Sequence, residues 1–280
     1  MQNIIAVVFD FDDTLAPDST SSFLETWGLD VKAFWRSVEP LLANGWDPVP
    51  AYLFKMIEES NSRGLIPITK TLLEQHGRRV HTYTGVGNIF NRLQKHAVSV
   101  NKKCSVEYYL ISSGIGTVLR SNPIAKHFSE IWASDFHYLP DGRISFPKNI
   151  VSYTDKTRFL FQISKGIFGT ESKGKPFEVN KKVSEENLRV PFKHMIFVGD
   201  GYTDIPCFSM LKKNGGIPIG VYDQENREKW GRAWGFAEDG RVSNLVPADY
   251  SKRSALSNSL MMAVESIAKK MALQSQTYQG

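Results

Sequence analysis

The sequence predicts an α/β fold built on a doubly wound parallel sheet, with a second, α-helical unit inserted after the first strand. Three observations support this prediction. Short apolar runs alternate along the chain with segments of helical periodicity. Several of these runs end on acidic or hydroxyl side chains. Between residues 17 and 79, in contrast, the sequence shows helical patterns and no convincing strand.

The predicted strands are apolar runs without polar alternation, which is typical of strands buried on both faces of a parallel sheet. They lie at residues 4–9, 106–111, 194–198, 217–222 and, more briefly, 242–246. A β-hairpin is expected as well, because Asp141 and Gly142 join two β-rich arms in the stretch FHYLPDGRISF.

Helical periodicity occupies the stretches between these strands. The predicted core helices are residues 86–96, 157–164, 203–213, 225–236 and 254–273. Apolar residues at helical spacing in the last of them indicate that it packs on the core. The final residues, 274–280, are expected to be frayed.

The inserted unit is predicted to contain helices only. Their patterns cover residues 19–27, 31–38, 51–60 and 69–76. We therefore divide the chain into an α/β core domain of residues 1–16 and 80–280 and a helical domain of residues 17–79. Aromatic side chains such as Trp35 and Tyr52 are expected to form a small core inside this helical domain, where some of them can also face a ligand.

Composition limits the classes of function. The 280 residues are 41% hydrophobic and 22% charged, which supports a sizeable core and argues against global disorder. Two cysteines exclude a disulfide framework and a Cys-rich zinc site. The small net charge of +5 does not predict a nucleic-acid partner. The apolar runs are too short for a membrane span or a signal peptide, so no membrane partner and a cytoplasmic location are expected. Nothing indicates the oligomeric state.

Polar side chains follow three of the predicted strands, at the edge where open α/β sheets bind ligands. Asp10 and Asp12 come from the first strand and Ser112 from the second. Asp200 and Asp204 follow the third strand. Separate parts of the chain are therefore expected to supply one set of functional groups.

This set suits phosphoryl transfer with Mg²⁺. Asp10 and Asp12 stand two positions apart on an extended chain and can share a face. A hard divalent cation offsets the repulsion between such carboxylates. One carboxylate can then attack phosphorus, while the second protonates the leaving oxygen and later activates water. A hydroxyl such as Ser112 and a cation such as Lys156 can hold the phosphoryl oxygens.

Four motifs resemble those of the haloacid dehalogenase-like (HAD) hydrolase superfamily, in the same order along the chain. They are FDFDDTL, LISSG, the lysine of YTDKTRFLF, and VGDGYTD. The resemblance implies a Rossmann-like α/β core in which residues 17–79 occupy the place of a helical cap. It also implies a Mg²⁺ cofactor.

The resemblance assigns a role to each matched residue. Asp10 would be the nucleophile that forms an aspartyl-phosphate, and Asp12 would be the acid and base. Ser112 would hydrogen-bond the phosphate, with the backbone amide of Ser113 nearby. Lys156 would bridge the phosphate and Asp10.

Four residues are expected at the metal, also by resemblance. Asp200 would ligate Mg²⁺, and Asp204 would steady the ion or its waters. The nucleophile and the backbone carbonyl of the acid and base complete the set. The expected metal residues are Asp10, Asp12, Asp200 and Asp204.

Simpler explanations stand beside these roles. Asp204 can cap the helix that follows it, and Ser112 can be an ordinary turn residue. Lys148 and Lys165 are neighbours of Lys156, which we prefer because it opens a helical pattern. Asp13 is expected to shape the turn rather than to bind a ligand.

The cap and the hairpin resemble the phosphoserine phosphatase-like branch of the superfamily. That branch has an acidic residue nine positions after the nucleophile, which reads the substrate amine, but this chain has Ser19 there, next to Asp18. We therefore expect a Mg²⁺-dependent phosphatase of a small phosphorylated metabolite and do not assign phosphoserine as its substrate. The alternatives are a phosphotransferase or phosphomutase on the same site, and a non-catalytic HAD-fold binding or regulatory protein.

Overall fold

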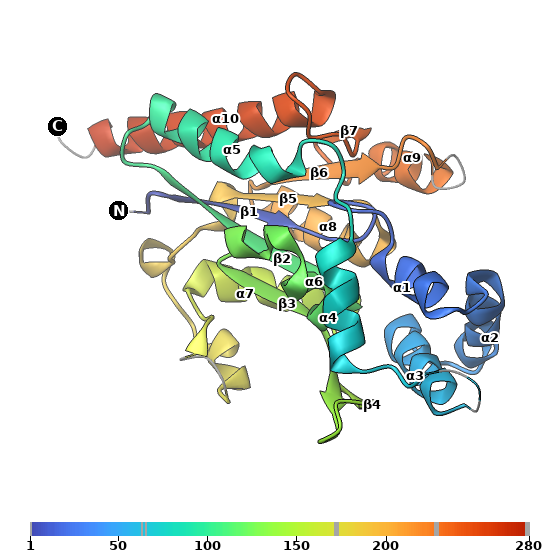
Figure 1. Cartoon of the computed structure of the whole chain (residues 1–280). Coiled ribbons are helices and arrows are strands. Elements are labelled where there is room, and N and C mark those ends of the chain that lie inside the picture. The colour runs from blue at the N-terminus through green and yellow to red at the C-terminus, as the bar shows by residue number, and fades with distance from the viewer. Residues whose placement is uncertain (1, 63, 65, 171–173, 227–229, 278–280) are drawn as a thin grey trace.

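A seven-stranded sheet forms the centre of the computed structural model, which describes residues 2–62, 64, 66–170, 174–226 and 230–277 (Figure 1). The strand order is β4-β3-β2-β1-β5-β6-β7. Every neighbouring pair is parallel except β3 and β4, which are antiparallel. The strands are β1 (Ile4–Phe9), β2 (Ser105–Ile115), β3 (Glu130–Tyr138), β4 (Ile144–Asn149), β5 (Met195–Gly199), β6 (Ile217–Tyr222) and β7 (Asn244–Pro247).

Helices cover both faces of this sheet, as the doubly wound fold predicts. Alternate residues of β1 point to opposite faces, and both sets are buried: Val7 joins one apolar cluster and Val8 the other. Helices α5 (Val86–Val100), α6 (Gly116–Ser121) and α10 (Ala255–Thr277) contribute to the first cluster. Helices α7 (Asp155–Lys165), α8 (Ile205–Lys213) and α9 (Trp230–Glu238) contribute to the second.

Four helices lie between β1 and α5, as the sequence predicts. They are α1 (Ser19–Trp27), α2 (Val31–Ala43), α3 (Pro48–Asn61) and α4 (Lys70–Arg79). The side chains of Asp18, Asp30, Asp47 and Thr69 accept hydrogen bonds from backbone amides at the four helix starts. Figure 1 shows α1, α2 and α3 beside the sheet, whereas α4 runs along α6 of the core. The domain bounds at residues 17 and 79 stay a prediction.

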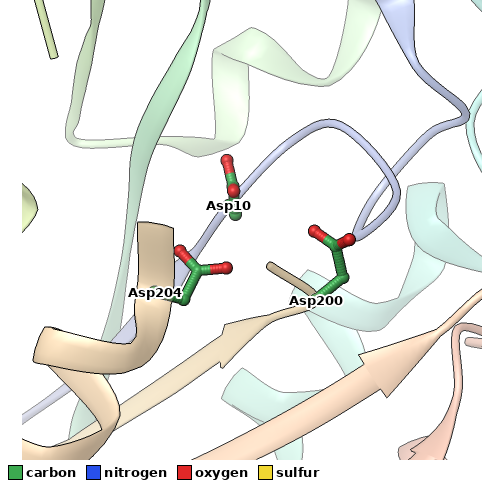
Figure 2. Close-up of side chains that lie close together, drawn as sticks. All are labelled: Asp10, Asp200 and Asp204. Atoms are coloured by element: carbon green, nitrogen blue, oxygen red, sulfur yellow. The ribbon is translucent and has the colours of Figure 1, made fainter. Parts of the chain in front are cut away.

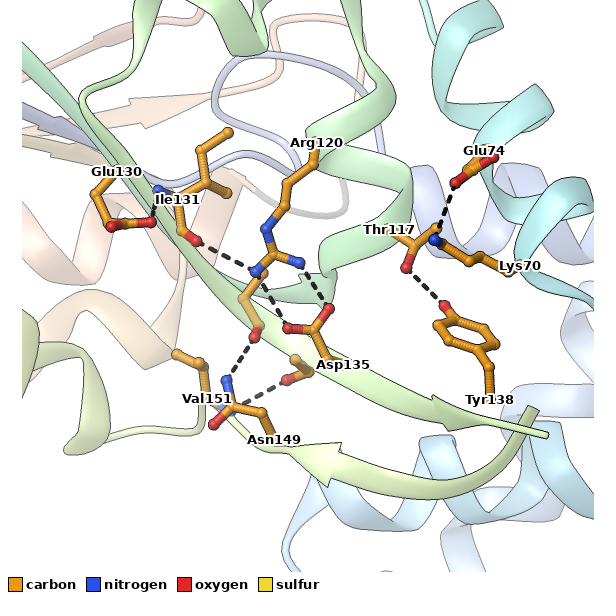
Figure 3. A network of polar contacts seen from close by, with 12 residues as sticks. Lys70, Glu74, Thr117, Arg120, Glu130, Ile131, Asp135, Tyr138, Asn149 and Val151 are labelled. Atoms are coloured by element: carbon orange, nitrogen blue, oxygen red, sulfur yellow. Dashed lines mark hydrogen bonds and ion pairs between the residues drawn. The ribbon is translucent and has the colours of Figure 1, made fainter. Parts of the chain in front are cut away.

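The predicted hairpin exists, but its first arm is more than a hairpin strand. β3 pairs antiparallel with β4 and parallel with β2, so it also belongs to the main sheet. Neither this parallel strand nor α6 was predicted. Figure 3 shows how α6 holds β3: the Arg120 guanidinium donates to both carboxylate oxygens of Asp135, at 2.7 and 3.1 Å, and to the Ile131 carbonyl oxygen at 3.2 Å.

The hairpin turn also contacts the helical insert. The amide of Lys70 donates to the carbonyl oxygen of Gly142 at 2.9 Å, and the amide of Ile144 donates to that of Ile68 at 3.0 Å. The loop before α4 and the hairpin therefore form one hydrogen-bonded unit.

Several predicted helix bounds differ from the structure; α2, for example, continues to Ala43 rather than ending at residue 38. Glu225 lies in a turn rather than in a helix, and α9 is described from Trp230 because residues 227–229 lie outside the described residues. The C-terminal helix continues to Thr277, so residues 274–277 are helical rather than frayed. Residues 278–280 lie outside the described residues. No helix in the described part of the chain is long and apolar enough to cross a membrane.

Candidate active site

The carboxyl ends of the central strands place the predicted acids together. Asp10 directly follows β1, and its amide donates to the Val198 carbonyl oxygen of the neighbouring β5 at 2.9 Å. Asp200 directly follows β5. Because parallel strands end at one edge of the sheet, these two acids meet although they are far apart in sequence.

Three buried carboxylates form the centre of the site. Asp10, Asp200 and Asp204 each have a carboxylate oxygen within 4.8 Å of the others, and Figure 2 shows the three side chains around one space. Their exposed fractions are 6%, 9% and 0%. The Thr14 hydroxyl also donates to Asp200 Oδ1, at 3.5 Å. A group of buried like charges at one point is unfavourable unless cations offset it.

Lys156 supplies one such cation. Its side chain is fully buried, and its Nζ atom donates to Asp10 Oδ2 and to Asp204 Oδ1, at 2.7 Å each. Although burial lowers the pKa of Lys156, the charges of Asp10 and Asp204 raise it above the usual value. The structure thus places Lys156, and not the exposed Lys148, among the predicted acids.

Asp12 lies apart from the three clustered carboxylates. Its Oδ1 accepts a hydrogen bond from the Ser19 amide, at 2.7 Å, where helix α1 begins. Burial, followed by the nearby charge of Asp18, raises the pKa of Asp12 to about 8. Gly114 makes room for the carboxylate, because a β-carbon there would lie 2.5 Å from Asp12 Oδ2. A pKa raised in this way suits a group that gives up a proton near neutral pH.

Asp204 serves Lys156 rather than the helix behind it. Its Oδ2 accepts from the Gly201 amide at 3.0 Å, and its side chain makes no capping bond to α8. Because Gly201 is the N-cap of the 3-10 turn Tyr202–Asp204, the Asp204 side chain caps this turn rather than α8 itself, and the capping role holds together with the contact to Lys156. Burial raises the pKa of Asp204 to about 6, against the lowering effect of Lys156.

The two predicted serines, Ser112 and Ser113, come from β2, which lies on the other side of β1 from β5 and Asp200. Ser112 is within the last part of β2 rather than after it, and its buried hydroxyl accepts from the Gly114 amide at 3.1 Å. Ser113 Oγ is buried without a hydrogen-bond partner in the described part of the chain. Its carbonyl oxygen accepts from the Tyr52 hydroxyl at 2.8 Å, which links β2 to α3.

A cavity of about 320 Å³ opens above these groups. Asp10, Asp12, Asp200, Ser112 and Ser113 all line it, so the structure brings five predicted site residues to one space. Asp13 lines it too and has the positive φ of 55° that suits its expected role in the turn.

Further residues that sequence reasoning did not assign to the site also line this cavity. Trp35, Tyr52, Asp18 and Thr20 come from the helical insert. Tyr153 comes from the loop between β4 and α7, three positions before Lys156. The aromatic content of the insert was the available signal, but a ring that faces a ligand cannot be told by sequence from one that packs in a core.

Comparison with known proteins gives one relative along the sequence. An uncharacterized protein of Borreliella burgdorferi is 27% identical over 288 residues, which cover 93% of this chain and 96% of the relative. No protein-family model matches the chain.

Solved structures give closer information about the fold. A probable phosphoserine phosphatase from Vibrio cholerae aligns with a TM-score of 0.58 and 9% identity, over 96% of this chain and 67% of the other. A phosphoserine phosphatase in its apo form aligns with a TM-score of 0.55 and 12% identity, over 88% and 94%. A HAD-family hydrolase from Salmonella enterica aligns with a TM-score of 0.53 and 14% identity, over 81% of this chain, which spans 65% of that hydrolase.

These likenesses establish the fold. The chain has a HAD-like, phosphoserine phosphatase-like fold: a mainly parallel sheet with helices on both faces and a helical insert after the first strand. The four motifs that resemble the superfamily therefore lie in a structure of the matching kind.

Proposed function

We propose that this protein is a Mg²⁺-dependent phosphatase that hydrolyses a small phosphomonoester through an aspartyl-phosphate on Asp10. The observation that carries the proposal is the meeting of three buried carboxylates with buried Lys156 at the ligand edge of the sheet. The fold supports it, because solved structures with this fold include phosphoserine phosphatases.

The donor set fits a magnesium ion. Mg²⁺ prefers oxygen ligands and is commonly held by a few carboxylates together with waters and a substrate phosphate. The carboxylates of Asp10, Asp200 and Asp204 face one another with a single lysine charge among them, so negative charge is in excess. Asp10, Asp200 and the backbone carbonyl of Asp12 would hold the ion, and Asp204 would steady it. When bound, Mg²⁺ supplies positive charge that favours approach of the phosphate.

The protein's own residues account for two chemical steps. In the first, a carboxylate oxygen of Asp10 bonds to phosphorus while the bond to the leaving oxygen breaks, and Asp12 gives its proton to that oxygen. In the second, water bonds to phosphorus, the bond to Asp10 breaks, and Asp12 takes the proton of the water. Lys156 holds a carboxylate oxygen of Asp10 in place before the first step, and Ser112 lies where it can hydrogen-bond the phosphoryl oxygens.

Hydrolysis of 4-nitrophenyl phosphate tests the proposal. We expect turnover that requires Mg²⁺, that stops with EDTA, and that falls at least about 10³-fold in Asp10→Asn. Asp30→Asn makes the same change at an exposed helix N-cap outside the cavity and should keep wild-type activity. Wild-type turnover by Asp10→Asn would refute the mechanism. Phosphorylation of an added acceptor alcohol instead of water would identify a phosphotransferase.

A further inference from the structure

The walls of the cavity above Asp10 determine which alcohol can leave. This inference rests on the proposed function, because the leaving group of a phosphate ester bound at Asp10 has to lie in the same cavity. Four residues that line the cavity lie outside the ends of the sheet strands, and we call them its walls. Asp18, Trp35 and Tyr52 belong to the helical insert, and Tyr153 belongs to the loop before α7.

All the charged side chains among the described residues that line the cavity are acidic. Among the described residues that line the cavity, none is Arg, Lys or His, whereas Asp18 adds a carboxylate on the side of the insert. Lys156 is fully buried and engaged by Asp10 and Asp204. An ester whose alcohol carries a carboxylate would therefore face Asp18 without a compensating cation, which is unfavourable in a partly desolvated site.

Both carboxylate oxygens of Asp18 accept hydrogen bonds from within the insert. Its Oδ1 accepts from the amides of Thr20 and Ser21, at 3.0 and 2.9 Å, and its Oδ2 accepts from the Ser21 hydroxyl at 2.6 Å. All three donors are neutral, and Asp18 forms no ion pair with any residue in the described part of the chain. The field of this carboxylate reaches Asp12, whose pKa it helps to raise.

Two aromatic side chains of the insert also line the cavity, and their polar atoms are already hydrogen-bonded. The rings of Trp35 and Tyr52 have centroids 5.9 Å apart. Trp35 Nε1 donates to the Ser21 hydroxyl at 2.9 Å, and the Tyr52 hydroxyl donates to the Ser113 carbonyl oxygen at 2.8 Å. What these two residues offer a ligand is ring surface. Aromatic surface next to a carboxylate is the arrangement that binds an organic ammonium ion.

We propose that the substrate is the phosphate ester of a small cationic alcohol without a carboxylate, of the choline or ethanolamine kind. The ammonium group lies between Asp18 and the rings of Trp35, Tyr52 and Tyr153, while the phosphate lies over Asp10. The size of the cavity agrees, because about 320 Å³ is at the small end for a ligand site and suits a short alcohol better than a nucleoside.

A matched pair of substrates isolates the positive charge. Phosphocholine and 3,3-dimethylbutyl phosphate have nearly the same shape, but carbon replaces the ammonium nitrogen in the second. We expect the wild-type protein to prefer phosphocholine by at least about tenfold in kcat/KM. We also expect it to hydrolyse O-phosphoserine and nucleoside monophosphates more slowly than phosphocholine.

Asp18→Asn then removes the charge and keeps the helix start, because Asn caps a helix as well as Asp does. The preference for phosphocholine should fall to about twofold or less. Any change in the proton affinity of Asp12 affects both esters on the same variant and cancels in the ratio. Asp30→Asn, the same change at the N-cap of α2, should keep the wild-type preference.

The aromatic wall has its own pair of variants. Tyr153 is 39% exposed, so it can be changed without opening the core. Tyr153→Phe keeps a ring and should keep the preference, whereas Tyr153→Leu should reduce it about threefold or more.

Calorimetry on Asp10→Asn repeats the comparison without turnover, by measuring the binding of phosphocholine and of its uncharged analogue. Equal kcat/KM or equal binding for the two esters, or a preference for O-phosphoserine or a nucleotide, would overturn the inference. Failure of the proposed function shows differently, as a wild-type protein that cleaves no ester at all while still binding phosphocholine in preference.

Discussion

Lys156 is the residue on which the electrostatics of the site depend. A fully buried ammonium group stands between two buried carboxylates, at 2.7 Å from each. Removing one member of such a group leaves uncompensated buried charges, which costs more than the ion pairs themselves contribute.

We therefore expect Lys156→Met to lower the free energy of unfolding by about 3–5 kcal/mol, in addition to abolishing activity. Urea denaturation without Mg²⁺ measures this loss. Lys148→Met, at an exposed position of β4, is the matched control and should stay within about 0.5 kcal/mol of the wild type. Equal stability of the two variants would contradict the account of Lys156 as a charge that the fold requires.

Residue by residue, the sequence predicts the acids that follow the strands but not the other residues that line the cavity. Asp10, Asp12 and Asp200 follow apolar strands, so their meeting at one edge is a consequence of parallel pairing. Tyr153 and Asp18 have no such pattern. The place of Asp18 depends on how the insert sits above the sheet, and that of Tyr153 on the path of the loop before α7, and no local periodicity records either.

Helices α4 and α6 approach each other closely at Gly77. Gly77 of α4 is buried against α6, and a β-carbon there would lie 2.2 Å from the Val118 carbonyl oxygen. Because that neighbour is backbone, it cannot rotate away. The helix that joins the insert to the core therefore depends on one position without a side chain.

We expect Gly77→Ala to lower the free energy of unfolding by about 1–3 kcal/mol, although alanine is the better helix former by about 1 kcal/mol. Gly87→Ala is the matched control, since Gly87 also lies in a helix but has nothing within 4 Å of the added carbon. It should leave stability unchanged or raise it. Chemical denaturation of both variants decides, and a stabilised Gly77→Ala would show that the two helices can separate without cost.

Sequence reasoning missed helix α6 and the parallel strand β3, because neither has a clear pattern of apolar residues along its own sequence. Helix α6 (Gly116–Ser121) is short and begins directly after β2, so six residues give too little periodicity to identify it. Only part of β3 is buried, and its first residues, from Glu130 to Trp132, are half-buried and without alternation. Both are fixed by tertiary contacts such as the pair of Arg120 with Asp135.

For the whole molecule, the buried His194, directly before β5, makes the free energy of unfolding depend on pH. His194 is 4% exposed, and its Nδ1 atom has no hydrogen-bond partner in the described part of the chain. Burial, followed by the charge of Lys193, lowers the pKa of His194 to about 4. Below its unfolded pKa of about 6.5, the unfolded chain binds a proton that the folded chain does not, so stability falls with falling pH.

Between pH 7 and pH 4 we expect this group to reduce the free energy of unfolding by about 3 kcal/mol. Urea denaturation of the wild type and of His194→Gln across this range isolates it, because the difference between the two curves removes the effect of other titrating groups. The wild type should lose more stability than the variant on acidification. Parallel curves would show that His194 does not titrate differently in the two states.

The hydrogen bond from the Ser19 amide to Asp12 Oδ1 couples the insert to the residue that we propose as the catalytic acid. α1 begins at Ser19, directly after the loop that carries Asp10 and Asp12. The first turn of α1 is therefore hydrogen-bonded directly to the Asp12 side chain. This hydrogen bond lowers the proton affinity of Asp12. A tilt of α1 away from the core would break it and tighten Asp12's hold on its proton. In the proposed mechanism, a displacement of the insert would therefore change how readily Asp12 releases its proton.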